Sequence, residues 1–295
     1  MAVRERDLAG ELAGLDALDT LEALDARGPR SARATARRVW SAMWPKVAAL
    51  GLVVLAWQAL VWAEWRPAWV VPPPGEVLGE LAEMAGTGEF WKAVSITMRR
   101  ALVGYGIALV LGLTVGLAVA RVRVLRTAVG SLITGLQTMP SIAWFPVAIL
   151  LFGLSEQAIT FVVVLGAAPS IANGIVSGVD HVPPILLRAG RVVGARGVAL
   201  FRHVVVPAAL PSCLAGLKQG WAFAWRSLMA GELLVIVAQK PSIGARLQFA
   251  RELADAKALF SLMIVVLLVG IAVDTVFGKF DGVLRARRGL VDQAT

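Results

Sequence analysis

Long runs without charged residues alternate with short basic stretches along most of this 295-residue chain. Residues 101–120 and 127–155, for example, contain no Asp, Glu, Lys or Arg. A helix needs roughly 20 apolar residues to cross the hydrocarbon core of a bilayer, so each run predicts a membrane-spanning helix. The pattern predicts six spans, at 47–63, 101–120, 128–153, 158–179, 212–238 and 259–277.

The third predicted span contains two prolines, Pro140 and Pro146. Proline removes a helical hydrogen bond, and irregular backbone at membrane depth is tolerated where it lines a cavity. We therefore expect a kink or a partial break in this span. Gln137, Ser141 and Trp144 surround the break, where they either line a pore or take part in ordinary helix packing.

Small residues recur at every fourth position in three of the predicted spans. Such stripes let helix backbones approach closely in lipid, so they predict a compact, all-helical membrane bundle. The stripes are Gly104, Ala108, Gly112, Gly116 and Ala120; Gly166, Ser170, Gly174 and Gly178; and Gly216, Gly220 and Ala224.

The composition agrees with a membrane protein and narrows its chemistry. Hydrophobic residues make up 58% of the chain, above the roughly 45–50% of soluble domains. The net charge is +9, but the basic residues flank apolar runs instead of forming one patch, which argues against nucleic-acid binding. One cysteine and two histidines far apart in sequence offer neither a disulfide nor a metal cluster. No nucleophile motif or carboxylate pair indicates an enzyme.

Lysine and arginine are distributed unequally between the two sides of the predicted bundle. With the N-terminus in the cytosol, the inner stretches hold 17 basic residues and the outer ones 8. The positive-inside rule therefore favours a cytosolic location for both termini. On this topology residues 1–46 and 279–295 are cytosolic, residues 47–278 form the membrane domain, and residues 180–211 form an inner loop.

The N-terminal segment has a pattern of its own. Over residues 1–25, leucines recur at three- to four-residue spacing between acidic residues, which predicts a cytosolic amphipathic helix or, alternatively, a disordered tail. The basic stretch that follows, residues 27–46, is expected to lie near anionic lipid headgroups.

The inner loop carries apolar residues where water should be the neighbour. A first short helix is predicted after Asp180, which can cap it, and a second over 198–206, ending at Pro207. Gly194 supplies the turn between them. Either the underside of the bundle or a second protein must cover the apolar face of the first helix. That face consists of Ile185, Leu186, Ala189, Val192 and Val193.

The spacing of the glycines and the proline in this loop resembles the EAA loop of ABC importer permeases. The family's pattern is Glu-Ala-Ala, three residues, Gly, nine residues and Ile-x-Leu-Pro. Two positions differ here, with Arg in place of the Glu and Gly in place of the second Ala. The likeness extends over about 72–288 and is nearest to type I permeases of the nitrate, sulfonate and taurine group. The corresponding residues of the loop are Arg188, Ala189, Gly190, Gly194, Phe201 and Pro207.

The resemblance implies a six-helix, non-catalytic membrane subunit that works as a homodimer. Two copies of a separate ATPase would grip the inner loops as coupling helices and use ATP with Mg²⁺, and an extracytoplasmic solute-binding protein would deliver the solute. The chain has no Gly-x-x-x-x-Gly-Lys-Ser/Thr phosphate loop, so ATP hydrolysis is expected in another polypeptide. We expect the chain in the cytoplasmic membrane of a bacterium, surrounded by lipid and with no cofactor of its own.

The fifth predicted span carries Lys218, Arg226 and Glu232. Charged side chains in a span are costly and usually face the bundle interior or water. Arg226 could bind a passing anion through parallel hydrogen bonds, or form an ion pair with Glu232 or with an acid of a partner subunit. Trp225 could face lipid, a neighbouring helix or the solute. The expected lining of a translocation path is Gln137, Ser141, Trp225, Arg226 and Glu232.

A secondary transporter or channel without an ATPase is the alternative function. Such proteins often show inverted repeats and acidic residues within spans, whereas the predicted spans contain only Glu232 and Asp274. The resemblance and Arg226 favour import of a small anion, namely an aliphatic sulfonate, taurine or nitrate. Thiamine-precursor-like or other organic solutes remain open.

Overall fold

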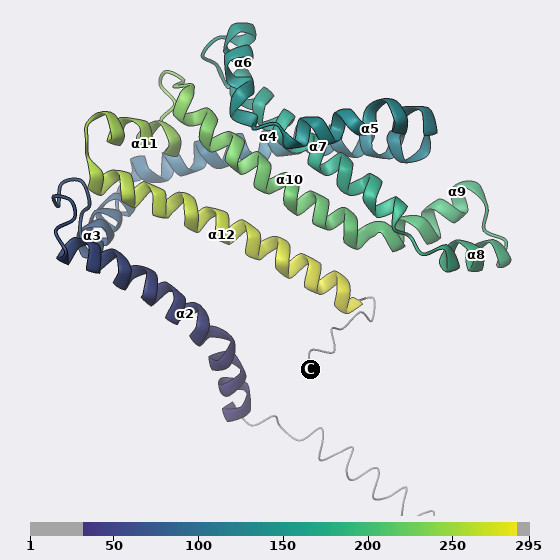
Figure 1. The fold of residues 1–295 in the computed structure, drawn as a ribbon, viewed down its shortest axis with the longest axis horizontal. Coiled ribbons are helices and arrows are strands. Elements are labelled where there is room, and N and C mark those ends of the chain that lie inside the picture. The colour runs from purple at the N-terminus through teal and green to yellow at the C-terminus, as the bar shows by residue number, and fades with distance from the viewer. Residues whose placement is uncertain (1–31, 288–295) are drawn as a thin grey trace, which may run out of the picture. The chain divides into compact units, whose positions relative to one another are not determined.

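A computed structural model describes residues 32–287 of the chain, and the amphipathic helix expected over 1–25 lies outside the described residues. All regular elements in this range are helices (Figure 1). Five of them are long and apolar enough to cross a membrane, and a bent pair of helices would make a sixth span among the described residues. The chain divides into two units, Met1–Trp65 and Arg66–Thr295, and each is described by itself.

The first unit is described through one continuous helix, α2 (Ala32–Trp62). Its apolar stretch, Met43–Trp62, begins four residues before the predicted span and contains Pro45 in its first turn. Exposed tryptophans, Trp44 and Trp62, stand near its two ends. At about 1.5 Å per residue they lie roughly 27 Å apart along the axis. Tryptophan is favoured at both membrane–water interfaces, so the helix has the length and the ends of a span.

The second unit contains the long helices that carry most of the apolar sequence. Side-chain caps fix the beginnings of three of its helices, because Thr87, Ser155 and Ser242 each accept a hydrogen bond from a backbone N–H three residues later. The helix after the three prolines begins at the last of them, as its fixed φ favours. The elements are α3 (Pro74–Ala85), α4 (Gly88–Arg121), α7 (Glu156–Asp180), α10 (Val206–Leu234), α11 (Ile243–Glu252) and α12 (Ala256–Arg287).

The predicted break in the third span is confirmed. α5 (Arg123–Thr138) ends before Pro140, and a short 3-10 helix, η1 (Ser141–Trp144), leads into α6 (Phe145–Phe152). The two halves meet at 102°. Pro146 lies in the first turn of α6, where its missing N–H removes no helical hydrogen bond, so it causes no second break.

The predicted small-residue stripes lie at the helix crossings. α7 packs against both α4 and α10 (Figure 1). A Cβ added to Gly174 would lie 2.4 Å from the Cα of Gly216, and one added to Gly112 would lie 2.7 Å from the Cβ of Ile171. These contacts leave no room for a side chain, which is how small residues allow close helix packing in lipid.

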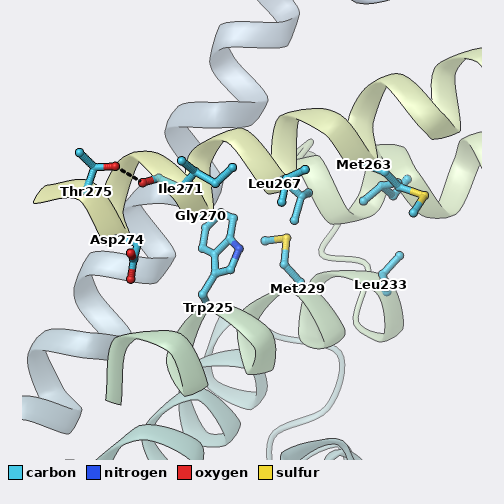
Figure 2. A pocket seen from close by; sticks show the side chains of 11 residues that line it. Trp225, Met229, Leu233, Met263, Leu267, Gly270, Ile271, Asp274 and Thr275 are labelled. Atoms are coloured by element: carbon cyan, nitrogen blue, oxygen red, sulfur yellow. Dashed lines mark hydrogen bonds between the residues drawn. The ribbon is translucent and has the colours of Figure 1, made fainter. Parts of the chain in front are cut away.

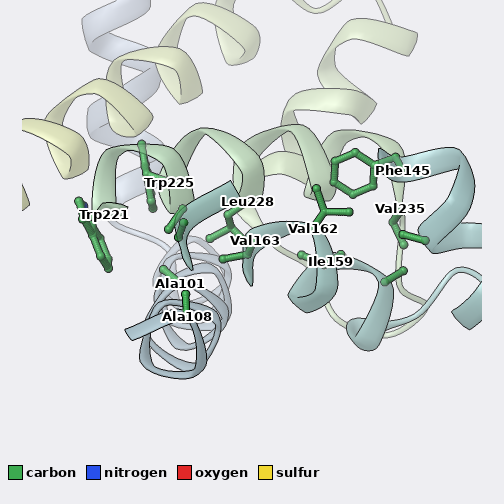
Figure 3. Packing of buried hydrophobic residues seen from close by; sticks show 14 of the residues in the cluster. Ala101, Ala108, Phe145, Ile159, Val162, Val163, Trp221, Trp225, Leu228 and Val235 are labelled. Atoms are coloured by element: carbon green, nitrogen blue, oxygen red, sulfur yellow. The ribbon is translucent and has the colours of Figure 1, made fainter. Parts of the chain in front are cut away.

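The main hydrophobic core lies where α4, α6, α7 and α10 meet (Figure 3). α7 contributes β-branched residues such as Val162 and Val163, α6 contributes Phe145, and α10 contributes Leu228; all four are at most 1% exposed. This core holds the broken third span against α7 and α10 and so positions the break next to the middle of α10.

Candidate functional site

A pocket of about 260 Å³ opens at the break between α5 and η1. We call it the break pocket. Gln137, Ser141 and Arg226, three of the five residues expected to line a path, are brought together in its wall, and Trp144 is there as well. α5 ends beside it, η1 starts in it, and α7 and α10 close it through Gly166 and Phe223. The proline-induced break therefore creates a pocket that brings several polar side chains together inside the bundle.

Arg226 is exposed in the break pocket. Its Nε donates a hydrogen bond to the Ala222 carbonyl at 3.1 Å, and its guanidinium lies 4.7 Å from the ring centre of Phe223. This cation–π contact orients the group. Among the described residues no acidic side chain pairs with Arg226, and Glu232 pairs with Arg100 instead. The expected alternative of an ion pair with Glu232 is therefore wrong, whereas a pair with an acid of a partner subunit stays a prediction. The two terminal nitrogens can therefore donate to a ligand.

Ser141 and Gln137 contribute polar groups with different freedom. Ser227 donates to the hydroxyl of Ser141 at 2.8 Å, which leaves the Ser141 proton available to another acceptor. The Gln137 amide is tied to α7 on both sides, because it donates to Ser170 at 3.2 Å and accepts from Asn173 at 3.3 Å. Among these side chains, Ser141 and Arg226 therefore keep hydrogen-bond donors available to a ligand in the pocket.

The apolar face of the inner loop is exposed. It lies on α8 (Pro184–Val192) and the residue that follows, and all five of its predicted members are exposed, with Val192 and Val193 at 88% and 86%. Gly190 instead faces inwards, where a Cβ would lie 2.7 Å from Leu200. Gly194 turns the chain with a φ of +89°, a conformation that glycine adopts without steric cost. The bundle's own underside therefore does not cover this face.

Two details of the predicted loop are wrong. Asp180 does not cap α8; it is the last residue of α7 and forms an ion pair with Arg126. The second short helix does not end at Pro207, because α9 (Gly197–Leu200) and a π-helical turn, η2 (Phe201–Val205), run on directly into α10. Proline is tolerated in the first turn of a helix, where no amide donor is needed, and the π turn precedes it.

Residues 108–285 match the family of binding-protein-dependent transport system inner membrane components. The matched stretch contains the break pocket, the inner loop and most of the core. The chain belongs to this family. Its predicted identity as an ABC transport permease with an all-helical, multi-pass membrane fold is thereby confirmed.

The sequence similarity between this permease and its relatives extends over most of its length. The taurine transport system permease protein TauC of Escherichia coli (strain K12) is 26% identical over 211 residues, 70% of this chain and 76% of that protein. The riboflavin transport system permease protein RibX of Chloroflexus aurantiacus is 29% identical over 252 residues, 85% and 92% of the two chains. A chain of the inward-facing MetNI methionine ABC transporter has the same fold, with a TM-score of 0.56 at 19% identity, over 65% of this chain and 94% of that one.

The permease places the other two expected path residues elsewhere. Trp225 is buried in the core and lines two pockets between α10 and α12, not the break pocket. Glu232 is fully buried and lies in the wall of neither the break pocket nor the two pockets between α10 and α12. We therefore treat Glu232 as part of the scaffold at the C-terminal end of α10.

Glu232 is the centre of a buried polar network, which we call the outer network. Its carboxylate accepts from Thr97 Oγ1 at 2.9 Å, from Arg100 Nη1 at 2.9 Å and from the Gly244 N–H at 3.0 Å. Arg100 also binds Glu156 through two parallel hydrogen bonds at 2.9 and 2.7 Å. The network ties α4, α7, α10 and α11 together.

The outer network was not predicted from the sequence, where Arg100 is one of the eight basic residues expected in the outer stretches. One signal was available, because a lone carboxylate within a span requires a cation and further donors to be stable. Arg100 and Glu156 stand directly beside charge-free runs, where such partners would be sought. Which of the nearby charges pairs with Glu232 depends on helix packing and not on spacing along the chain.

Proposed function

We propose that this permease forms the translocation path for a small anionic solute, namely an aliphatic sulfonate, taurine or nitrate, and that the break pocket is part of that path. The observation that carries the proposal is the exposed guanidinium of Arg226 beside a broken span. A planar guanidinium matches the oxygens of a sulfonate, nitrate or carboxylate with parallel, charge-assisted hydrogen bonds. Ser141 adds a neutral donor on the facing element.

The chemistry of the pocket favours an anion more specifically than the relatives' names do. TauC is named for taurine, which supports a sulfonate, but RibX is named for riboflavin, so names within the family differ widely. A cation at membrane depth with no acidic partner among the described residues is costly unless water or an anion compensates it. A sulfonate-sized anion supplies that compensation.

The exposed face of α8 supports the proposed partners. We propose that two copies of the permease assemble with two copies of a cytosolic ATPase, which uses ATP and Mg²⁺, while the permease itself hydrolyses nothing and binds no cofactor. The loop that includes Arg188, Ala189, Gly190, Gly194, Phe201 and Pro207 would seat in the ATPase. An extracytoplasmic binding protein would dock on the other side, and both termini would be cytosolic in a bacterial cytoplasmic membrane.

The substrate proposal is tested by Arg226→Ala in the assembled transporter reconstituted with its ATPase and binding protein. Ethanesulfonate uptake should fall about a hundredfold or more, since hydrogen bonds to charged groups are among the strongest in proteins. Basal ATPase activity and assembly should be unchanged. Arg251→Ala, which removes an exposed arginine from α11, is the matched control and should transport normally. Normal uptake by Arg226→Ala would remove the anion role.

A further inference from the structure

A second pocket, of about 520 Å³, lies between α10 and α12 and shares Arg226 with the break pocket. Its wall also contains Lys218 and Gln219 from α10 and Asp274 from α12. Two cations and one anion therefore surround this space and leave a net positive charge. We call it the inner pocket, because Lys218 stands closer than Arg226 to the end of α10 that joins the inner loop.

The ion pair in the inner pocket is exposed in the described part of the chain. Lys218 Nζ lies 2.8 Å from Asp274 Oδ1, and the two side chains are 47% and 62% exposed. Figure 2 shows Asp274 projecting from α12 beside Trp225. Exposed ion pairs contribute little to stability, because water competes for both partners. Both charges lie within spans, and charged residues there usually mark a pathway for ions or substrates.

The two cations of α10 occupy successive positions along one helix. Lys218 and Arg226 are eight residues apart, or about 12 Å along the axis. Arg226 lies in the walls of both pockets, so a solute bound to it borders the space in which Lys218 lies. The amide of Gln219 supplies further hydrogen-bond donors in the same wall.

We propose that Lys218 is a second anion-binding residue of the path. Asp274 pairs with Lys218 until the solute arrives. The inference rests on the proposed function, since it takes the solute to be an anion that first binds Arg226. The solute then replaces the Asp274 carboxylate at Lys218, and Asp274 returns when the solute leaves. Conduction requires sites that bind a solute well enough to admit it and weakly enough to release it. Competition from the Asp274 carboxylate lowers the affinity of Lys218 for the solute.

The test compares uptake of radiolabelled ethanesulfonate by the complete reconstituted transporter in four variants. Lys218→Gln should slow uptake about tenfold or more, because it removes a charged donor. Lys218→Arg should keep most of the activity. The double variant Lys218→Gln with Asp274→Asn removes both charges and allows a neutral hydrogen bond between the two side chains. If the pair is purely structural, this variant should restore uptake. Lys279→Gln, which removes an exposed cation from the same helix as Asp274, is the control.

The double variant decides the outcome. If it stays as slow as Lys218→Gln while assembly and basal ATPase activity are normal, the cation itself is needed and the proposal holds. If it recovers uptake, the pair is structural and the proposal is wrong. Arg226→Ala is measured in parallel to separate this result from the proposed function. If Arg226→Ala blocks uptake and the double variant recovers it, only the role of Lys218 is overturned.

Discussion

Two charged residues six positions apart on α10, Arg226 and Glu232, have opposite surroundings. Arg226 is exposed in a pocket, and among the described residues its side chain contacts a backbone carbonyl and an aromatic ring. Glu232 is 0% exposed, and three donors from α4 and α11 satisfy its carboxylate. A buried carboxylate is stable only when its charge and its lone pairs are matched in this way. At the residue scale, the first is suited to bind a solute and the second to hold helices together.

Removing the cation of the outer network should destabilise the permease strongly. Arg100 is 8% exposed and contacts both Glu156 and Glu232, so Arg100→Ala leaves a buried carboxylate without its cation. We expect a loss of about 3–5 kcal/mol in the free energy of unfolding. Thermal unfolding of the detergent-solubilised protein measures it.

The neighbouring arginine is the control for this prediction. Arg99 is exposed, so Arg99→Ala should change the free energy of unfolding by no more than about 0.5 kcal/mol. Equal unfolding temperatures for the two variants would show that the outer network contributes nothing to stability.

At the scale of elements, α7 is the helix on which the others are assembled. Its glycines face α10, and its bulky residues Val163 and Ile171 pack against glycines of α4, so its position is fixed by close contact with both helices. The broken span packs against the same helix, which is why the break pocket has α7 as one wall. The geometry of the pocket therefore depends on packing between glycines as much as on the residues that line it.

Gly174→Ala tests this dependence. The added Cβ would lie 2.4 Å from the Cα of Gly216, so the two helices must separate. Overpacking of this kind costs about 1–3 kcal/mol, which should appear as a lower unfolding temperature and slower uptake. Gly106→Ala is the matched control, because nothing lies within 4 Å of its added Cβ. It should be neutral or slightly stabilising, and equal destabilisation of the two variants would contradict the account.

Features encoded locally could be predicted, and features that depend on distant partners could not. Pro140 predicted the break because proline acts on the residues next to it, although the angle of the bend follows from packing. Pro207 misled the sequence interpretation, because a proline in the first turn of a helix and one that ends a helix look alike without the structure. Arg100 pairs with residues 56 and 132 positions away, so no sequence pattern identified the outer network.

At the scale of the whole molecule, α10 connects the parts of the proposed mechanism. It continues from α9 through η2 in the inner loop, passes Lys218 and Arg226, and ends in the outer network. A displacement of the inner loop would therefore be transmitted along one helical rod to both pockets. The central claim is that an ATPase bound to the exposed face of α8 changes the geometry of the two pockets through α10.

Co-purification of the ATPase with the permease tests this claim most directly. Val192→Asp and Val193→Asp place charges on the exposed apolar face of α8, whereas Leu253→Asp does so at a residue 80% exposed after α11, at the opposite end of the bundle. The account predicts that tagged permease loses its ATPase in the two α8 variants and keeps it in the Leu253 variant. Full retention of the ATPase by both α8 variants would contradict it.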